Sequence, residues 1–249
     1  MIRGLYTSAA GMLTNLLRHE TIVHNLSNVR TIGYKADRAT VEDFPSLLLT
    51  EVRGGRTKFE IGQAGTGVSL ASLKTDFTSG PLKLTDNPLD FAIADEGFFR
   101  IQTQEGIRYT RDGRFHRDID GRLITANGYL VLGENGPINL PDGALTVTPQ
   151  GEVFVNNAQI DRLTLARFDD KDNIIKDGQT TFAARDGDPE LMQSQEIHIY
   201  QGYLEESNLD SAQAVTEMMS VLRAYQASQR LVQFQDQING QAVNEIGRV

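Results

Sequence analysis

The chain has 249 residues, a formal net charge of −9 and no cysteine. Nucleic-acid binding needs clustered Lys and Arg, so this acidic balance predicts no nucleic-acid partner. The lack of cysteine excludes disulfides and thiolate metal sites. An apolar content of 39% is enough for a hydrophobic core. The sequence has no run of 18 apolar residues, so we expect no membrane insertion. The first seven residues lack the pattern of a cleavable signal peptide, so we expect any export to use another route.

The N-terminal segment, residues 1–40, shows a helical apolar rhythm. Its stripe is Ile2, Leu5, Ala9, Met12, Leu16, His19, Val23 and Leu26. Alternating steps of three and four residues give a 3.5-residue period, which keeps one seam facing a partner helix. The segment is therefore predicted to hold one helix of a helical assembly module.

The next segment, residues 41–70, is rich in residues that break regular structure. These are Pro45, Gly54, Gly55, Gly62, Gly65 and Gly67. Such a composition favours an irregular or extended connector. A short docked helix including Phe44 and Leu47 to Leu49 is the alternative.

Residues 71–204 contain regularly spaced turn signals. The turn dipeptides end at Gly106, Gly113, Gly121, Gly128, Gly136, Gly143 and Gly151. This spacing of seven or eight residues is typical of short strands joined by two-residue hairpins with positive φ. We predict a β-meander, with further strands at 153–155, 163–168 and 197–200. The polar stretch 169–178 and the turn 185–189 should separate them.

The final segment, residues 205–249, repeats the helical rhythm after four candidate cap residues, Ser207, Asn208, Asp210 and Ser211. Residues 1–40 have five basic and two acidic side chains, and residues 201–249 have three basic and six acidic ones. These balances of +3 and −3 suit paired helices. The predicted fold class is α+β, with the terminal helices paired as a coiled-coil module and an all-β domain inserted between them. The alternative is an ordinary amphipathic helix at each end, lying on a globular core.

The sequence carries no recognisable catalytic, cofactor or metal motif. Its four histidines lack metal-ligand spacing, and the acidic stretches 169–172 and 186–190 lack the glycine that a calcium loop of the EF-hand type requires. No phosphate-binding loop or nucleophile elbow occurs. We therefore expect no enzyme activity, no catalytic residues, no cofactor and no metal.

Two end motifs resemble those of a known family. The N-terminal motif comprises Asn25, Leu26, Asn28, Thr31, Gly33, Tyr34 and Lys35. The C-terminal motif spans 201–210 and is followed by Arg223-Ala224-Tyr225. Residues 93–100 and 109–115 resemble the central β domain of the same family. Together, these segments and the two end motifs resemble those of the rod and hook family of bacterial flagellar axial proteins. The length is similar to that of the longer rod proteins, distal or proximal. Small departures at His24, Ser27 and Leu222 leave the exact rod segment open.

The resemblance implies a structural subunit that self-assembles into the hollow helical rod of the flagellar basal body and transmits torque to the hook. The implied partners are copies of the chain, neighbouring rod and hook axial proteins, and the flagellar type III export apparatus. The implied location is the basal body, in the periplasm or cell-wall layer. We expect the terminal helices to be disordered or loosely held in the monomer and to fold on assembly.

Ten large residues are predicted to form the assembly seam. They are Leu5, Met12, Leu16, Val23, Leu26, Val215, Met218, Leu222, Tyr225 and Val232. The alternative functions are a soluble β-rich binding module oligomerised by its terminal helices and a hook-type or cap-associated axial protein.

Overall fold

The computed structural model describes residues 2–43, 47–53, 56–64, 68–185, 187, 189–193 and 196–246. The chain forms two compact units. The helical unit comprises Met1–Leu26, Asp37–Lys74 and Asp210–Val249, and the β unit comprises Ser27–Ala36 and Thr75–Leu209. The α+β class is therefore confirmed, with one helix near each end and a β-rich central region.

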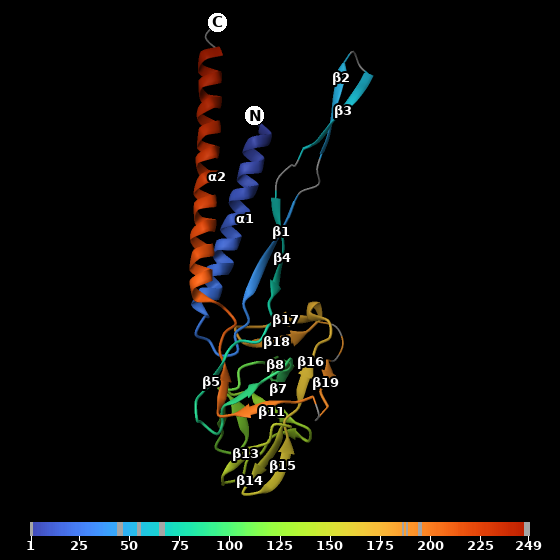
Figure 1. Ribbon diagram of the computed structural model, residues 1–249, viewed down its shortest axis with the longest axis vertical. Coiled ribbons are helices and arrows are strands. Elements are labelled where there is room, and N and C mark those ends of the chain that lie inside the picture. Colours follow the sequence, from blue (N-terminus) through green and yellow to red (C-terminus); the bar gives the residue numbers. More distant parts are fainter. Residues whose placement is uncertain are drawn as a thin grey trace. The chain divides into compact units, whose positions relative to one another are not determined.

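The helical unit contains two long helices, α1 (Ile2–Ser27) and α2 (Ser211–Ile246), drawn in Figure 1. They run antiparallel, because Arg18 pairs with Glu217 at 3.1 Å while Gly4 lies beside Gln235. Within the described residues, neither helix combines the length and the hydrophobicity that a membrane-spanning helix needs.

Asp210 caps the N-terminus of α2. Its carboxylate accepts hydrogen bonds from the backbone N–H groups of Ala212 at 2.8 Å and Gln213 at 3.1 Å. One of the four cap residues proposed from the sequence is therefore confirmed in that role. Asp210→Ala should lower the free energy of unfolding of α2 by about 1 kcal/mol. Helical circular dichroism during denaturant titration measures this change. Ser211→Ala is the control, and equal effects of the two substitutions would contradict the capping role.

The helical unit also contains four strands. They are β1 (Asp37–Asp43), β2 (Leu47–Arg53), β3 (Arg56–Ala64) and β4 (Val68–Thr75). β1 pairs with β4, and β2 pairs antiparallel with β3. The described part of 41–70 therefore differs from the expected irregular connector, and Leu47 to Leu49 lie in a strand and not in a helix. Gly62 sits in β3 beside a register shift, which is a common place for glycine in a strand. Phe44, Pro45 and four of the other glycines lie outside the described residues.

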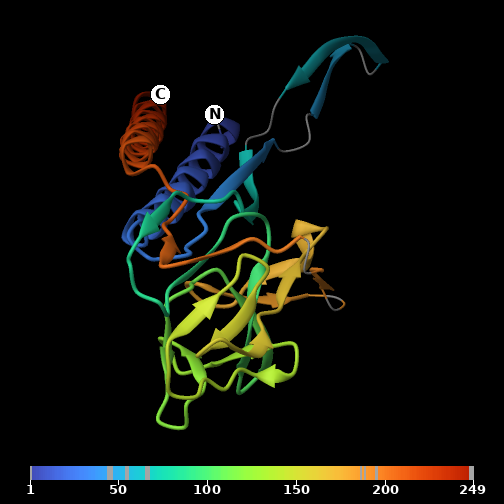
Figure 2. The same ribbon diagram turned by 60° about the horizontal axis from the view of Figure 1, so that its bottom comes forward.

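The β unit contains the remaining strands, which Figure 2 shows from a second direction. They are β5 (Leu82–Leu84), β6 (Phe91–Ile93), β7 (Phe98–Thr103), β8 (Gly106–Thr110), β9 (Phe115–Arg117), β10 (Leu123–Thr125), β11 (Leu130–Gly133), β12 (Gly136–Pro137), β13 (Leu145–Val147), β14 (Glu152–Val155), β15 (Ala158–Arg162), β16 (Leu165–Arg167), β17 (Ile174–Lys176), β18 (Thr181–Ala184), β19 (Glu190–Leu191), β20 (Ile199–Gln201) and β21 (Tyr203–Glu205). A 3₁₀ turn, Lys171–Asn173, precedes β17.

The strand order is more complex than the predicted meander. In the largest sheet of the described residues, β17-β18-β8-β7-β11-β10-β9 lie in this order, and β16 also pairs with β7. Among the described residues, only β9–β10–β11–β12 and β13–β14–β15 are meanders of three or more consecutive strands. Two further pairs join the start of the unit to its end, β6 with β20 and β5 with β21. Turn spacing predicts hairpins but does not reveal which distant strands pair.

The turn glycines behave as predicted at six of the seven positions. Positive φ angles occur at Gly106, Gly121, Gly128, Gly136, Gly143 and Gly151. Gly113 is the exception, because its role is close backbone approach. A Cβ atom there would lie 1.7 Å from the carbonyl oxygen of Phe91.

Two hydrophobic clusters hold the β unit together. The larger cluster includes Phe99, Ile101, Phe115 and Leu163, each fully buried. The smaller one is aromatic and contains the rings of Phe98 and Phe182, whose centroids lie 5.3 Å apart. Edge-to-face packing of this kind adds stability beyond simple burial.

Candidate functional site

The ten predicted seam residues are all partly or fully exposed. On α1, Leu16 and Val23 are each 40% exposed, and on α2, Leu222 is 42% exposed. Leu5, Met12, Leu26, Met218, Tyr225 and Val232 are half-buried, and Val215 is exposed. The structure therefore leaves these apolar side chains with surface that further contacts could cover.

Three contacts between α1 and α2 involve residues outside the predicted seam. Gly4 lies beside Gln235, Gly11 lies beside the Ser228 hydroxyl, and Arg18 pairs with Glu217. The small residues let the helix backbones approach each other. A search for a stripe of apolar residues selects large side chains, so the sequence did not predict the contact at Gly4 and Gly11. The seven-residue spacing of Gly4 and Gly11 was the available signal.

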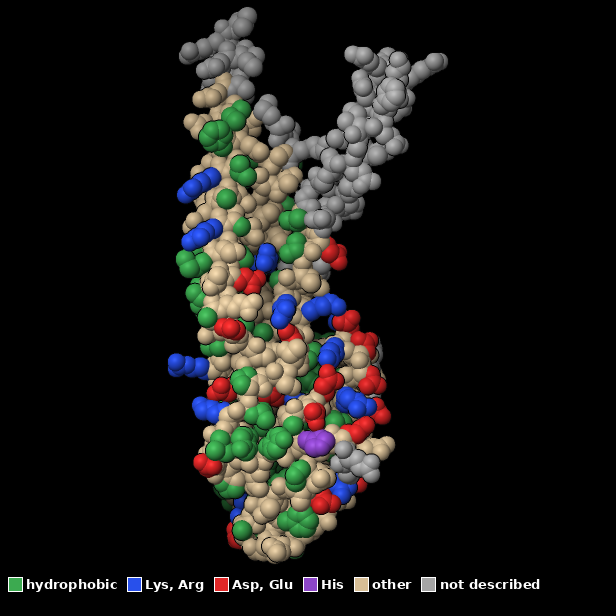
Figure 3. Space-filling model, in the orientation of Figure 1, with side chains coloured by type: hydrophobic (Ala, Val, Ile, Leu, Met, Phe, Trp, Pro, Cys, Tyr) green, Lys and Arg blue, Asp and Glu red, His purple; other side chains and the backbone are tan. Residues whose placement is uncertain are grey.

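Further large apolar side chains are exposed on both helices outside the predicted seam. They are Tyr6, Leu13, Met219, Leu231, Phe234 and Ile238, with Tyr6 69% and Phe234 66% exposed. Figure 3 shows hydrophobic side chains along the visible face of α2, interspersed with basic ones. Extended apolar surface of this kind marks an interaction site.

Asn25 and Asn28 of the N-terminal motif organise the end of α1. The amide of Asn25 donates to the carbonyl of Asp37 at 2.7 Å and accepts from its N–H at 3.0 Å. The carbonyl of Asn28 accepts from the N–H of Thr31 at 3.0 Å, and its side chain accepts from the Thr31 hydroxyl at 3.3 Å. Leu26 is half-buried. The two asparagines therefore fix the path of the chain after the helix.

Glu205 joins the two family motifs within the β unit. Its carboxylate accepts from the Lys35 amine at 2.6 Å, from the Gly80 N–H at 2.8 Å and from the Arg111 guanidinium. The three charged side chains are at most 3% exposed. Arg111 also donates to the carbonyls of Gly97, Ile93 and Asp95. Two buried cations therefore share one carboxylate.

Burial and charge shift the pKa values of this cluster. Burial lowers the pKa of the Lys35 amine, the charge of Arg111 lowers it further, and Glu205 only partly offsets both. Burial alone would raise the pKa of the Glu205 carboxyl. The charges of Arg111 and Lys35, with the hydrogen bonds, outweigh burial and hold that pKa below its usual value. Sequence reasoning gave Lys35 as a motif residue but did not find its partners.

Tyr34 and Gly33 complete the docking of the N-terminal motif. Tyr34 is fully buried, and the Lys176 amine lies 4.0 Å from the centre of its ring while donating to the Lys35 carbonyl at 2.8 Å. Gly33 donates its N–H to the Glu205 carbonyl at 2.8 Å. Gly33 has a φ of +67° and lies six residues beyond the end of α1, so it forms a tight turn and does not cap the helix.

Gly33→Ala should destabilise the β unit strongly. A Cβ atom at this position would lie 2.5 Å from backbone atoms of Arg111 and Asp112, and φ is positive. We expect a loss of about 3 kcal/mol or more in the free energy of unfolding, measured by denaturant titration. Gly128→Ala is the matched control, because φ there is +81° and a Cβ would meet nothing within 4 Å. The control should lose only about 1 kcal/mol.

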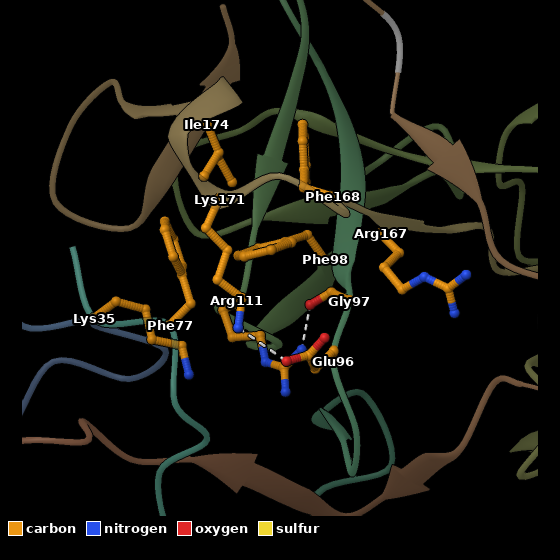
Figure 4. A pocket seen from close by; sticks show the side chains of 10 residues that line it. All are labelled: Lys35, Phe77, Glu96, Gly97, Phe98, Arg111, Arg167, Phe168, Lys171 and Ile174. Atoms are coloured by element: carbon orange, nitrogen blue, oxygen red, sulfur yellow. Dashed lines mark hydrogen bonds and ion pairs between the residues drawn. The ribbon is translucent and has the colours of Figure 1, made fainter. Parts of the chain in front are cut away.

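A small cavity lies beside the buried cations, as Figure 4 shows. Phe77, Phe98 and Phe168 line it, together with Arg111, and an exposed Lys171–Glu96 ion pair of 3.0 Å lies next to it. Its volume of about 20 Å³ holds roughly one water molecule. Such a space is too small for a sugar or peptide. Among the described residues, no group of three acidic or histidine side chains is placed to hold a metal ion.

Two family models match the chain. Residues 92–155 match the "Flagellar hook protein FlgE/F/G D1 domain", and residues 200–245 match the "Flagellar basal body rod FlgEFG protein C-terminal". The hook-basal body complex protein FlhO of Bacillus subtilis (strain 168) is 32% identical, over the full length of both chains. The chain belongs to this flagellar rod and hook family.

Two rod proteins are similar to nearly the same extent. FlgG of Bacillus subtilis (strain 168) is 31% identical over 98% of this chain and 99% of its own. FlgF of Caulobacter vibrioides is 29% identical over the full length of both. These relatives carry the names of basal-body rod proteins and not of enzymes. The family resemblance deduced from the two end motifs is therefore confirmed, as is a location in the flagellar basal body.

Proposed function

We propose that the chain polymerises into the hollow helical rod of the flagellar basal body and transmits torque from motor to hook. The observation that carries the proposal is the exposed apolar surface of α1 and α2. Fully burying one exposed large apolar side chain contributes roughly 1.5 to 3 kcal/mol, and the partly buried seam residues each contribute a share of that. Several such residues per subunit are therefore enough to drive assembly, even after the entropy cost of association.

The two helices act as one coiled-coil assembly module in this proposal. Support comes from the positions through which α1 meets α2, since Gly4, Gly11 and Arg18 are seven residues apart. That step is the repeat of a coiled-coil seam. The small residues pack α1 against α2 within one subunit, and the ten seam residues contact neighbouring subunits. The segments 1–40 and 205–249 then supply the helices of the module, 41–70 is the connector and 71–204 supplies most of the β domain. Residues 27–36 and 205–209 belong to the β unit, and the strands of 41–70 belong to the helical unit.

The partners follow from the geometry of a rod. A contact between two different surfaces of identical subunits builds an open helical filament when its rotation does not close. Copies of this chain fill most positions, and neighbouring rod and hook axial proteins adjoin the ends of the segment. The subunit reaches the periplasm or cell-wall layer through the flagellar type III export apparatus. The terminal helices gain most of their stability on assembly, because tertiary packing supplies most helical stability.

A deletion strain of the source bacterium tests the proposal. We expect the strain to be non-motile, and its isolated basal bodies to carry a rod that is shortened or absent in electron micrographs. The gene for the intact chain should restore both. Complete rods and normal swimming in the deletion strain would contradict the proposal.

A further inference from the structure

Three short segments of the β unit form a small structural unit of their own, which we call the latch. They are residues 33–36, 80–84 and 202–208. β5 lies in the second segment and pairs with β21 in the third, with Leu84 opposite Tyr203. The three segments come from the start and the end of the β unit, so they depend on each other across a long stretch of chain.

Polar contacts tie the latch together. Gly33 donates to the Glu205 carbonyl at 2.8 Å, and the Ala36 N–H donates to the Asn208 side chain at 3.0 Å. Glu206 donates its N–H to the Pro81 carbonyl at 2.9 Å. The Glu205 carboxylate lies at the centre, because it accepts from residues of the first two segments. Removing the Glu205 carboxylate would therefore leave the Gly80 N–H without its acceptor and Lys35 with the Thr78 carbonyl in place of a charged partner.

The latch lies beside the hydrophobic clusters and is not part of them. Among the described residues, neither hydrophobic cluster contains a residue of segments 33–36, 80–84 or 202–208. Leu82 and Leu84 of β5 are 40% and 55% exposed. The stability of the latch therefore depends on one buried charge cluster, a few hydrogen bonds and the buried side chains of Tyr34, Ala36 and Leu204, whereas the sheets rest on the two larger clusters.

Sequence separation adds to this difference. Lys35 and Glu205 are 170 residues apart, and Ala36 and Asn208 are 172 apart. Closing a loop of this length costs conformational entropy that only the latch contacts can offset, unless the sheets have already brought its ends together. The sheets therefore have to form before the latch can close.

We propose that the latch is a separate folding unit that closes last and opens while the sheets of the β unit stay folded. Glu205 is its positioning residue. Opening releases residues 33–36, which include the last three residues of the N-terminal motif, while the sheets of the β unit stay folded. The unit thus has two states, one with both family motifs fixed together and one with the N-terminal motif free.

Native-state hydrogen exchange on the full chain tests this proposal. In the unmodified chain, the latch amides of Gly33, Gly80 and Glu206 should exchange at least about ten-fold faster than the core amides of Leu123 and Ile138. Glu205→Gln should accelerate the latch amides by about 100-fold or more, and the core amides should stay at least about ten-fold better protected than the latch amides. Glu206→Gln is the matched control, because its exposed ion pair with Lys83 contributes little, and it should change neither set.

Equal exchange rates of latch and core amides, in the unmodified chain or in Glu205→Gln, would show a single cooperative unit and overturn the proposal. No acceleration of the latch amides would overturn it as well. If the Glu205→Gln chain does not fold, Asn208→Ala provides the weaker perturbation, because it removes the acceptor of the Ala36 N–H. That variant should accelerate the latch amides of Gly33, Ala36, Gly80 and Glu206 together, and Leu123 exchanging as fast as these amides would contradict a separate latch.

Discussion

Leu222→Glu is expected to abolish polymerisation while leaving the monomer folded. Leu222 is 42% exposed on α2, so a carboxylate there remains hydrated in the free subunit. At an assembled interface the same carboxylate would be buried without a partner, which costs several kcal/mol. The critical concentration for polymerisation, measured by sedimentation, should rise by about 100-fold or more.

Ser220→Glu is the matched control for this substitution. It adds the same charge two residues away, at an exposed position. The residues one helical turn before and after it on the helix surface, Thr216 and Arg223, are polar. We expect its critical concentration to stay within about three-fold of the unmodified value, since surface charges contribute little. Equal effects of both substitutions would mean that net charge, and not the apolar surface, controls assembly.

Glu205→Gln is expected to destabilise the β unit far more than Lys35→Met. Removing the carboxylate leaves two buried cations unpaired, which costs about 3 to 5 kcal/mol in the free energy of unfolding. Lys35→Met leaves Arg111 paired with Glu205, and the apolar side chain fills a buried position. The loss should therefore be about 1 kcal/mol or less, as when buried charges are replaced by apolar groups. Denaturant titration of each variant measures the difference.

The pH dependence of stability separates the two residues further. The lowered pKa of Glu205 gives stability that is present above the ordinary carboxyl pKa and is lost as pH falls through the folded-state value. The lowered pKa of Lys35 acts in the alkaline range, where stability rises as pH passes from the folded-state pKa toward 10.5. Lys35→Met should remove the alkaline rise and keep the acid loss. An alkaline rise that persists in this variant would contradict the assignment to Lys35.

The helices and many of the strands could be predicted from the sequence because their signals are local. The 3.5-residue rhythm, the cap at Asp210 and the turn glycines such as Gly128 each act within a few residues. The segment 41–70 was different, since its glycines indicated an irregular connector while its described parts form strands. The glycines did not indicate the long antiparallel pair of β2 and β3, in which Gly62 lies beside a register shift.

The arrangement of the candidate site could be predicted only in part. The motif around Lys35 was recognised, but its contact with Glu205 spans 170 residues, and no local pattern encodes that distance. The contact surface of Gly4 and Gly11 was missed for a different physical reason. Close helix packing needs small side chains, whereas a hydrophobic stripe selects large ones. The ten seam residues were predicted from the sequence and are at least partly exposed. Their contact with neighbouring subunits stays a prediction.

Electron microscopy of the purified full chain at rising concentration tests the central claim most directly. If α1 and α2 assemble through their exposed apolar surfaces, the chain should form helical filaments with a central channel. Leu222→Glu should prevent these filaments and Ser220→Glu should not. Discrete particles of fixed subunit number at every concentration would contradict the account.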